Sequence, residues 1–157
     1  MTSQFDPTQF LDATTTEAAS RRPPLKAGEY HATIGAPEVR ANIQGKKDPS
    51  RLYNFIDFPV TVDVSSIPGE LDRLGVDTVE LRHSVSLDLT DSGALDWSPG
   101  RNTGLRFLRE ATGNNVAGQA FSIRKLEGRM IKVKIGHREY PEGSGELQDQ
   151  IESMAKP

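Results

Sequence analysis

A short, strict alternation of apolar and polar residues falls within the segment Phe121–Arg138. The alternating residues are Ile131, Lys132, Val133, Lys134 and Ile135. A period of two is typical of a strand with one face toward a core and the other toward water. The segment therefore predicts a strand that is apolar on one side and basic on the other. Such a face suits a sheet that binds polyanions, and it equally suits a face that is only solvated.

Three segments nearer the N-terminus also alternate and predict strands. They are Gly28–Arg40, Arg51–Asp63 and Thr78–Thr90. In the first, Gly35 and Pro37 indicate a bulge or an edge position. The apolar side of the third comprises Val79, Leu81, Val85, Leu87 and Leu89. His83 has the same parity as these residues, so we expect it in the core or at its rim.

The strand predicted at Arg51–Asp63 carries two aromatic residues on the side opposite its apolar face. The apolar face comprises Leu52, Ile56, Phe58, Val60 and Val62, whereas Tyr53 and Phe55 have the other parity. Exposed rings beside a basic loop can stack nucleic-acid bases. The same rings can instead be covered by the N-terminal arm or by a helix, and the sequence does not decide between the two.

One helix is predicted between the third strand and the basic strand. Ser98 and Pro99 are typical of a helix start, and Gly113 is typical of the position after a helix end. Between them, Leu105 and Leu108 form a stripe at helical spacing, so we expect a helix over Arg101–Thr112. We also expect short helical turns within Val64–Asp77 and Ser122–Leu126, and a last strand within Glu146–Met154.

The order strand, strand, strand, helix, strand, strand is that of the OB-fold, a five-stranded Greek-key barrel. We therefore expect a mainly β protein with one helix, in which residues 25–155 form a single OB-fold-like antiparallel barrel. The loops Gln44–Ser50 and Glu139–Gly145 would flank its binding face. Residues 1–24 are rich in Thr, Ala and Ser, which predicts an extended or flexible arm with Phe5 and Phe10 as its candidate anchors.

Length and composition set limits on the class of protein. A chain of 157 residues is long enough for one domain with a real core, and a mean hydropathy of −0.53 favours long loops or arms. The absence of Cys excludes disulfides and Cys-based zinc sites. No apolar run approaches the ~20 residues of a membrane span, and the first ten residues do not resemble a signal peptide. We therefore expect no membrane partner.

The charge is unevenly distributed. The net charge is −3, but residues 98–138 contain nine basic and two acidic residues and are therefore +7, which leaves −10 for the rest. An acidic chain with this asymmetry can still present a basic groove to nucleic acid.

No catalytic constellation is evident. His31, His83 and His137 have no metal-ligand spacing, and the glycine-rich stretch Gly100–Gly104 lacks the ending of a phosphate-binding loop. We therefore expect a protein that is not an enzyme and that holds neither a metal nor a cofactor.

Three groups of short motifs carry a resemblance to a known class. The first is Lys26-Ala27-Gly28-Glu29-Tyr30, and the second is Gly100-Arg101-Asn102 followed by Leu105, Leu108 and Glu110-Ala111-Thr112-Gly113. The third is Leu126-Glu127-Gly128-Arg129 followed by Ile131, Val133 and Gly136-His137-Arg138. Over roughly residues 24–154 the chain resembles the small single-stranded-DNA-binding or replication-associated proteins of tailed bacteriophages.

The resemblance implies an OB-like barrel that coats single-stranded DNA in the cytoplasm of an infected bacterium. A second copy of the chain and other phage proteins are further candidate partners. The resemblance and the basic and aromatic face together point to nine candidate DNA-binding residues. They are Lys46, Lys47, Arg51, Tyr53, Phe55, Arg82, Lys132, Lys134 and Arg138. Such proteins often end in a strongly acidic tail, whereas Glu139–Pro157 has five acids and one Lys, which argues against partner recruitment by the tail.

A structural role is the alternative. A Thr/Ala-rich arm before a compact β domain also suits a phage virion protein, such as a capsid decoration or cementing subunit. In that case the arm ties neighbouring subunits together, and the protein belongs to the virion rather than to the host cytoplasm.

Overall fold

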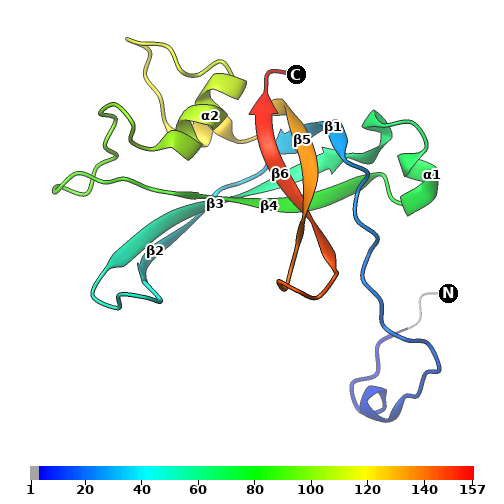
Figure 1. Cartoon of the computed structure of the whole chain (residues 1–157). Helices are drawn as coiled ribbons and strands as arrows, with labels where there is room; N and C mark the ends of the chain where they lie inside the picture. Colours follow the sequence, from blue (N-terminus) through cyan, green and yellow to red (C-terminus); the bar gives the residue numbers. More distant parts are fainter. Residues whose placement is uncertain (1–3) are drawn as a thin grey trace.

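The computed structural model describes residues 4–157, which form a mainly β structure with one long helix (Figure 1). The strands are β1 (Gly28–Ile34), β2 (Glu38–Gln44), β3 (Leu52–Asp63), β4 (Thr78–Ser86), β5 (Met130–Glu139) and β6 (Leu147–Ala155). The helices are α1 (Glu70–Leu74) and α2 (Thr103–Ala111), with 3-10 turns at Phe10–Asp12, Val64–Ser66 and Ile123–Leu126. The short turns expected before β4 and β5, and the last strand, are thereby confirmed.

The six strands form one antiparallel sheet in which β3 pairs with three other strands, β1, β2 and β4. Along one edge, the first half of β3 pairs with β2 and its second half pairs with β1, for example Tyr53 with Ile43 and Thr61 with Thr33. The other edge of β3 pairs with β4. β5 joins the opposite edge of β1 to β6. Every pairing is antiparallel, as expected.

The single strand predicted at Gly28–Arg40 is wrong, because the chain bends there into β1 and β2. At the bend, the backbone N–H of Gly35 donates to the carbonyl of Pro59 at 2.6 Å. A Cβ at position 35 would lie 2.7 Å from the Pro59 ring, so this approach requires glycine. Pro37 then precedes β2, which leaves β1 and turns along the first half of β3.

The sheet differs from the expected five-stranded closed barrel. It has six strands because the first predicted strand is split, and within residues 4–157 it is open, since β4 and β6 do not pair with each other. Helix α2 lies over the gap between these two strands (Figure 1). The long strand predicted at Thr78–Thr90 is shorter than expected and ends at Ser86.

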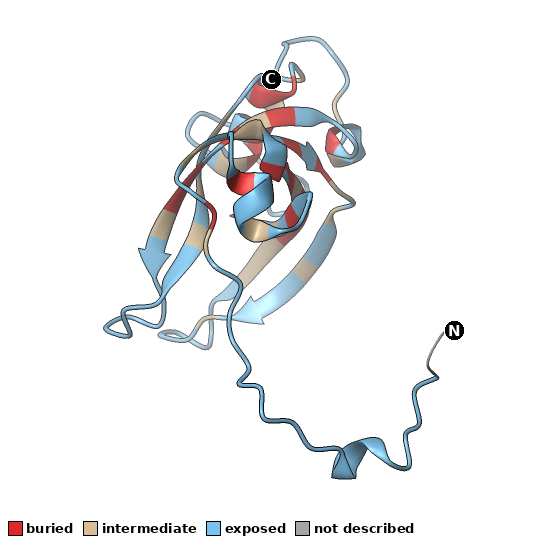
Figure 2. Ribbon diagram, turned by 90° about the vertical axis from the view of Figure 1, so that its right-hand side faces the viewer, coloured by how far each residue is buried: buried red, intermediate tan, exposed pale blue. Residues whose placement is uncertain are grey.

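The core comprises the inner faces of the strands and the buried side of α2; Figure 2 colours the buried residues red. Its largest fully buried side chains include Tyr30, Phe58, Ile56, Leu105, Leu108, Ile131 and Ile135, which confirms the predicted apolar parity of the strands and of the helix stripe. Leu52 and Leu89 are exceptions, at 52% and 41% exposed. Leu52 lies in the β2–β3 hairpin, which extends beyond the core, and Leu89 lies beyond the end of β4.

Helix α2 begins later than predicted. Its N-cap is Asn102 rather than Ser98, and Asn102 is fully buried with φ 49°. The Asn102 side chain accepts from the Asp88 N–H at 2.9 Å and donates to the carbonyls of Asp88 and Asp96 at 2.9 and 2.8 Å. The start of α2 is therefore set by contacts with the preceding loop. Gly113, with φ 73°, follows the helix end as predicted.

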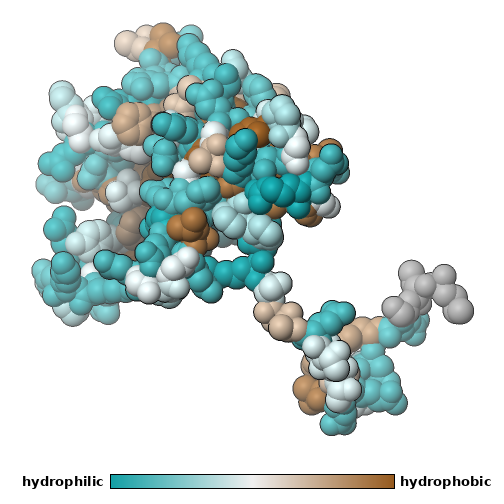
Figure 3. Space-filling model, turned by 45° about the vertical axis from the view of Figure 1, so that its right-hand side comes forward, coloured by the Kyte–Doolittle hydropathy of each residue, from teal (hydrophilic) through white to brown (hydrophobic). Residues whose placement is uncertain are grey.

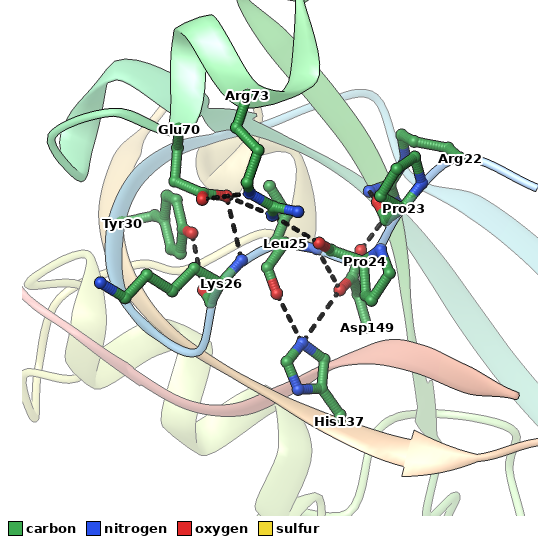
Figure 4. Close-up of polar contacts among 10 residues, drawn as sticks. All are labelled: Arg22, Pro23, Pro24, Leu25, Lys26, Tyr30, Glu70, Arg73, His137 and Asp149. Carbon is green, nitrogen blue, oxygen red and sulfur yellow. Dashed lines mark hydrogen bonds and ion pairs between the residues drawn. The ribbon is translucent and has the colours of Figure 1, made fainter. Parts of the chain in front are cut away.

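The segment before β1 is fastened to the sheet through Asp149 of β6 (Figure 4). The Asp149 carboxylate accepts from Arg22 at 2.6 Å and from the backbone N–H of Leu25 at 2.9 Å. His137 of β5 donates from Nε2 to the carbonyl of Leu25 at 2.5 Å. The Leu25 side chain is fully buried in the core. These contacts fix the chain at Arg22–Leu25.

Glu70 of α1 fastens the next residues. Its buried carboxylate accepts from Arg73 at 2.6 and 2.7 Å and from the backbone N–H of Lys26 at 3.0 Å. The Arg73 hydrogen bonds, helped by that of Lys26, lower the pKa of Glu70 to about 2. Tyr30 donates to the Lys26 carbonyl at 2.6 Å, and its burial, followed by the charge of Glu70, raises its pKa to about 12. Arg73 also donates to the Pro24 carbonyl at 2.7 Å.

Residues 4–23 form an exposed arm that stands away from the rest of the chain (Figure 3). The rings of Phe5 and Phe10 lie 5.1 Å apart and pack on each other, but they remain 71% and 51% exposed. The two residues expected to anchor the arm therefore do not pack on the sheet.

Deleting residues 1–21 is expected to leave the melting temperature nearly unchanged, because the arm buries none of its described side chains. Replacing Leu25 with alanine is expected to cost about 2–5 kcal/mol, because Leu25 is fully buried. Thermal unfolding followed by circular dichroism measures both. A large loss of stability in the truncated chain would show that the arm belongs to the fold.

Candidate nucleic-acid interface

The candidate residues on β2 and β3 gather at one hairpin, which we call the hairpin platform. It comprises Arg40, Lys46, Lys47, Arg51, Tyr53 and Phe55. The antiparallel register sets Arg40 opposite Phe55 and Ile43 opposite Tyr53. Because neighbours across a strand pair share a face, the Arg40 guanidinium and the Phe55 ring project on the same side.

The two rings of the platform lie next to each other with nearly parallel planes. Tyr53 and Phe55 are half-buried, with their centroids 6.3 Å apart and their planes 25° apart. The Arg51 guanidinium lies 5.0 Å from the Tyr53 centroid, and that of Arg40 lies 4.8 Å from the Phe55 centroid. Rings and guanidinium planes both stack on nucleic-acid bases, so all four groups suit that contact.

The loop between β2 and β3 presents the lysines of the platform. The backbone of the turn is closed by hydrogen bonds from Gly45 to the Arg51 carbonyl at 2.9 Å and from Arg51 to the Asp48 carbonyl at 3.1 Å. A Cβ at position 45 would lie 2.9 Å from the Tyr53 ring. The loop is therefore held against the ring, with Lys46 and Lys47 exposed to solvent. Residues 38–55 hold four basic and two acidic residues.

A buried carboxylate, that of Asp57, binds Arg40 of the platform and Arg82 beside it. Asp57 of β3 is 4% exposed and accepts from Arg40 at 2.6 and 3.1 Å. Arg82 and Ser84 of β4 also donate to it. The bidentate Arg40 contact, followed by those of Arg82 and Ser84, holds the pKa of Asp57 well below its usual range. Arg82 therefore lies next to the platform with much of its side chain exposed.

Sequence analysis missed Arg40 and the role of Asp57. Asp57 shares the parity of Tyr53 and Phe55, which placed it on the outer face. Its burial depends on the register that brings Arg40 from β2 and Arg82 from β4 to the same carboxylate. One sequence feature could have indicated this role: Asp57 is an acidic residue on the same face as Tyr53 and Phe55, where basic residues were expected.

The two lysines of β5 are separate from the platform. β5 borders β1 rather than β2, and each lysine lies close to a carboxylate of a neighbouring strand. Lys132 Nζ is 3.9 Å from Glu29, and Lys134 Nζ is 3.8 Å from Glu152. The outer face of β5 is therefore charge-compensated rather than purely cationic.

Arg138 lies in a second hairpin, formed by β5 and β6. Its guanidinium is 5.5 Å from the Tyr140 centroid, which repeats the pairing of Arg with an aromatic ring seen on the platform. Both hairpins extend in the same direction from the sheet (Figures 1 and 2). Arg82 borders cavities on both sides of β4, one shared with Asp57 and one shared with Arg138. The face between the hairpins thus carries the arginines Arg22, Arg82 and Arg138 together with the carboxylates of Glu38, Asp57, Glu80 and Asp149.

Part of the positive charge of residues 98–138 has a structural use. The Arg109 guanidinium lies between Trp97 and Phe121, at 4.7 and 4.2 Å from their centroids. Arg129 donates to the Thr112 carbonyl at 2.9 Å. These arginines hold the loops around α2, so the excess of charge in this segment does not by itself make a groove.

No group of three or more His, Asp or Glu side chains within residues 4–157 is arranged to hold a metal ion. None of the helices in that part of the chain is long and apolar enough to cross a membrane. The chain matches no protein-family model, and no curated protein is significantly similar to it.

Proposed function

We propose that this protein binds single-stranded DNA on the face between its two hairpins. The observation that carries the proposal is the hairpin platform. Its two half-buried rings lie beside the guanidinium groups of Arg40 and Arg51, and two exposed lysines lie at its edge. Base stacking by the rings and phosphate contacts by the lysines together bind single strands without reading their sequence.

The strand pairing supports an OB-fold-like interpretation. If β1 and β2 are counted as one bent strand, the first strand pairs with the second and the fourth, the second with the third, and the fourth with the fifth. Oligonucleotide-binding OB-folds use the face of strands two and three and the two loops L12 and L45. On this count β3 and β4 supply that face, and the two hairpins supply those loops.

A role in the replication or recombination of a tailed phage, in the cytoplasm of its host, remains the biological setting that the sequence resemblance implies. The geometry adds the chemistry to this proposal and does not identify the host. No step of the proposed function breaks or forms a covalent bond, so the protein acts as a binding protein rather than as an enzyme.

Replacing both Lys46 and Lys47 with alanine is expected to make oligo-dT binding less sensitive to salt. Single-strand binding falls with a log–log slope of about −0.7 per phosphate neutralised, so losing two contacts makes the slope less negative by roughly 1.4. Fluorescence polarisation with labelled oligo-dT at several salt concentrations measures the slope.

The matched control is the double replacement of Lys132 and Lys134 with alanine. It removes the same charge from lysines that already lie close to Glu29 and Glu152, so the slope is expected to stay near that of the unchanged protein. If the β5 pair changes the slope and the platform pair does not, the DNA lies on the β5 face and the proposed interface is misplaced.

The exposed arm favours a second candidate function, that of a phage virion subunit. Residues 4–23 are exposed throughout and are fastened to the sheet only at their C-terminal end. An arm of this kind can tie neighbouring subunits. Association of the purified chain in the absence of any oligonucleotide, together with no binding to oligo-dT, would favour this candidate.

A further inference from the structure

A gap separates β4 from β6, and both strands border it with a free edge. Within residues 4–157, β4 pairs with β3 alone and β6 pairs with β5 alone. A free strand edge presents backbone N–H and C=O groups to a further strand, and extended segments bind proteins by adding to such edges. The gap is therefore a candidate docking place for an extended segment.

The gap has an apolar end and a polar end. Beneath α2, a cavity of about 580 Å³ is bordered by Val85, Phe107 and Met154. At the other end, a cavity of about 610 Å³ is bordered by the acids Glu80 and Asp149 and by the arginines Arg22, Arg82 and Arg138. Phe107 is 45% exposed even though it faces this cavity. The apolar end thus lacks a cover in the described part of the chain.

His83 lies where the two cavities meet, since it borders both. Its Nε2 is buried and finds no hydrogen-bond partner among residues 4–157. A buried polar atom without a partner is unfavourable, so a hydroxyl or backbone group from an added segment would improve this site. The uncovered Phe107 and the unpartnered His83 therefore lie along the same gap.

The direction of the strands matches an arm segment. Residues 80–84 of β4 and 148–151 of β6 border the polar end, whereas 83–86 and 151–154 border the end beneath α2. Both strands therefore run from the polar end toward α2. A segment with its aromatic N-terminal part beneath α2 would be antiparallel to both.

The N-terminal arm has this order of residues. Phe10 and Leu11 precede Thr14, Thr15 and Thr16, and Arg21 follows. The gap spans residues 80–86 of β4, or about 24 Å at ~3.4 Å per residue, and the segment from Phe10 to Arg21 is long enough to span it. Phe10 would meet Phe107, and the threonines would pass His83.

The arm leaves its own domain at the polar end of this gap, which Arg22 borders, and then runs away from α2. Arg22 is held by Asp149, and Arg21 lies 3.0 Å from Glu146, which carries the arm along the β5–β6 hairpin. Pro23 and Pro24 stiffen the exit. Figures 1 and 3 show the arm extending outward from there. We propose that this arm docks in the gap between β4 and β6 of a second copy, with Phe10 buried beneath α2.

The full chain is expected to associate in sedimentation velocity experiments at increasing concentration. Phe10→Ser in the arm and Phe107→Glu in the gap are each expected to raise the dissociation constant about tenfold or more, which corresponds to at least ~1.4 kcal/mol. Val76→Glu is the matched control, because Val76 is 42% exposed and lies at the turn before β4. It is expected to leave association unchanged.

Mixing the two variants separates arm exchange from other modes of association. The Phe107→Glu chain retains an intact arm, and the Phe10→Ser chain retains an intact gap, so the mixture is expected to form a heterodimer that neither variant forms alone. A full chain that stays monomeric, or a mixture that does not associate, would overturn the proposal. This inference does not rest on DNA binding, and its test contains no oligonucleotide.

Discussion

Replacing Phe55 with alanine is expected to weaken oligo-dT binding by roughly 5- to 150-fold. Each base stacked on an aromatic ring contributes about 1–3 kcal/mol by alanine substitution, and 1.4 kcal/mol is a factor of ten. Phe55 lies at the centre of the platform, against Tyr53 and beneath the Arg40 guanidinium. The loss of stability should be small, because the ring lies outside the core cluster. Fluorescence polarisation measures the binding, and thermal unfolding checks the fold.

The matched control for this prediction is Phe107→Ala. Phe107 is an exposed ring with its own arginine, Arg106, at 5.1 Å, but it lies on α2 and outside the platform. Its loss is expected to leave the affinity for a short oligonucleotide unchanged. Equal effects of the two replacements would remove the case for base stacking at Phe55. Unfolding of the Phe55 variant would mean that β3 is needed by the fold on both of its faces.

Replacing Glu70 with glutamine is expected to destabilise the chain by about 1.5–3 kcal/mol, because the buried side chain loses its charge-assisted hydrogen bonds with Arg73. For a domain of this size, that lowers the melting temperature by roughly 3–12 °C. Asp72→Asn is the matched control on the same helix, because Asp72 is exposed. Similar and small losses in the two variants would show that the Glu70 contacts do not hold the segment before β1.

The same carboxylate makes stability depend on pH in a defined direction. The pKa of Glu70 is lowered from 4.5 to about 2 in the folded chain, so the unfolded chain binds a proton more readily. The stabilisation is present above pH 4.5 and is lost as the pH falls toward 2. Stability measured between these limits should therefore fall less steeply for Glu70→Gln than for the unchanged chain, with Asp57 supplying the remaining acid sensitivity.

Local patterns predicted much of the secondary structure because burial imposes them directly. The period of two in β5 corresponds to Ile131, Val133 and Ile135 buried on one face. The stripe in α2 corresponds to Leu105 and Leu108 buried beneath it. The helix start was misplaced, because Asn102 is held by Asp88 and Asp96, and those contacts form only when the preceding loop folds back.

Local sequence patterns could not predict the open sheet or the arrangement of the site, because both depend on which strands pair and in which register. Gly35 indicated an irregularity, but not that the chain would turn there into a second strand along β3. The outward parity of Tyr53 and Phe55 was predicted correctly. The carboxylates that lie close to Lys132 and Lys134 come from β1 and β6, so their compensation appears only in the assembled sheet.

The most direct test of the proposed function is a titration of labelled oligo-dT with the full chain at several salt concentrations, beside a duplex of the same length. Contacts with three to five phosphates give a log–log slope of roughly −2 to −3.5 for the single strand. We expect saturable binding with a slope in this range and a clear preference for the single strand over the duplex. Absence of binding at low salt, or equal binding of the duplex, would contradict the proposal that the hairpin platform binds single-stranded DNA.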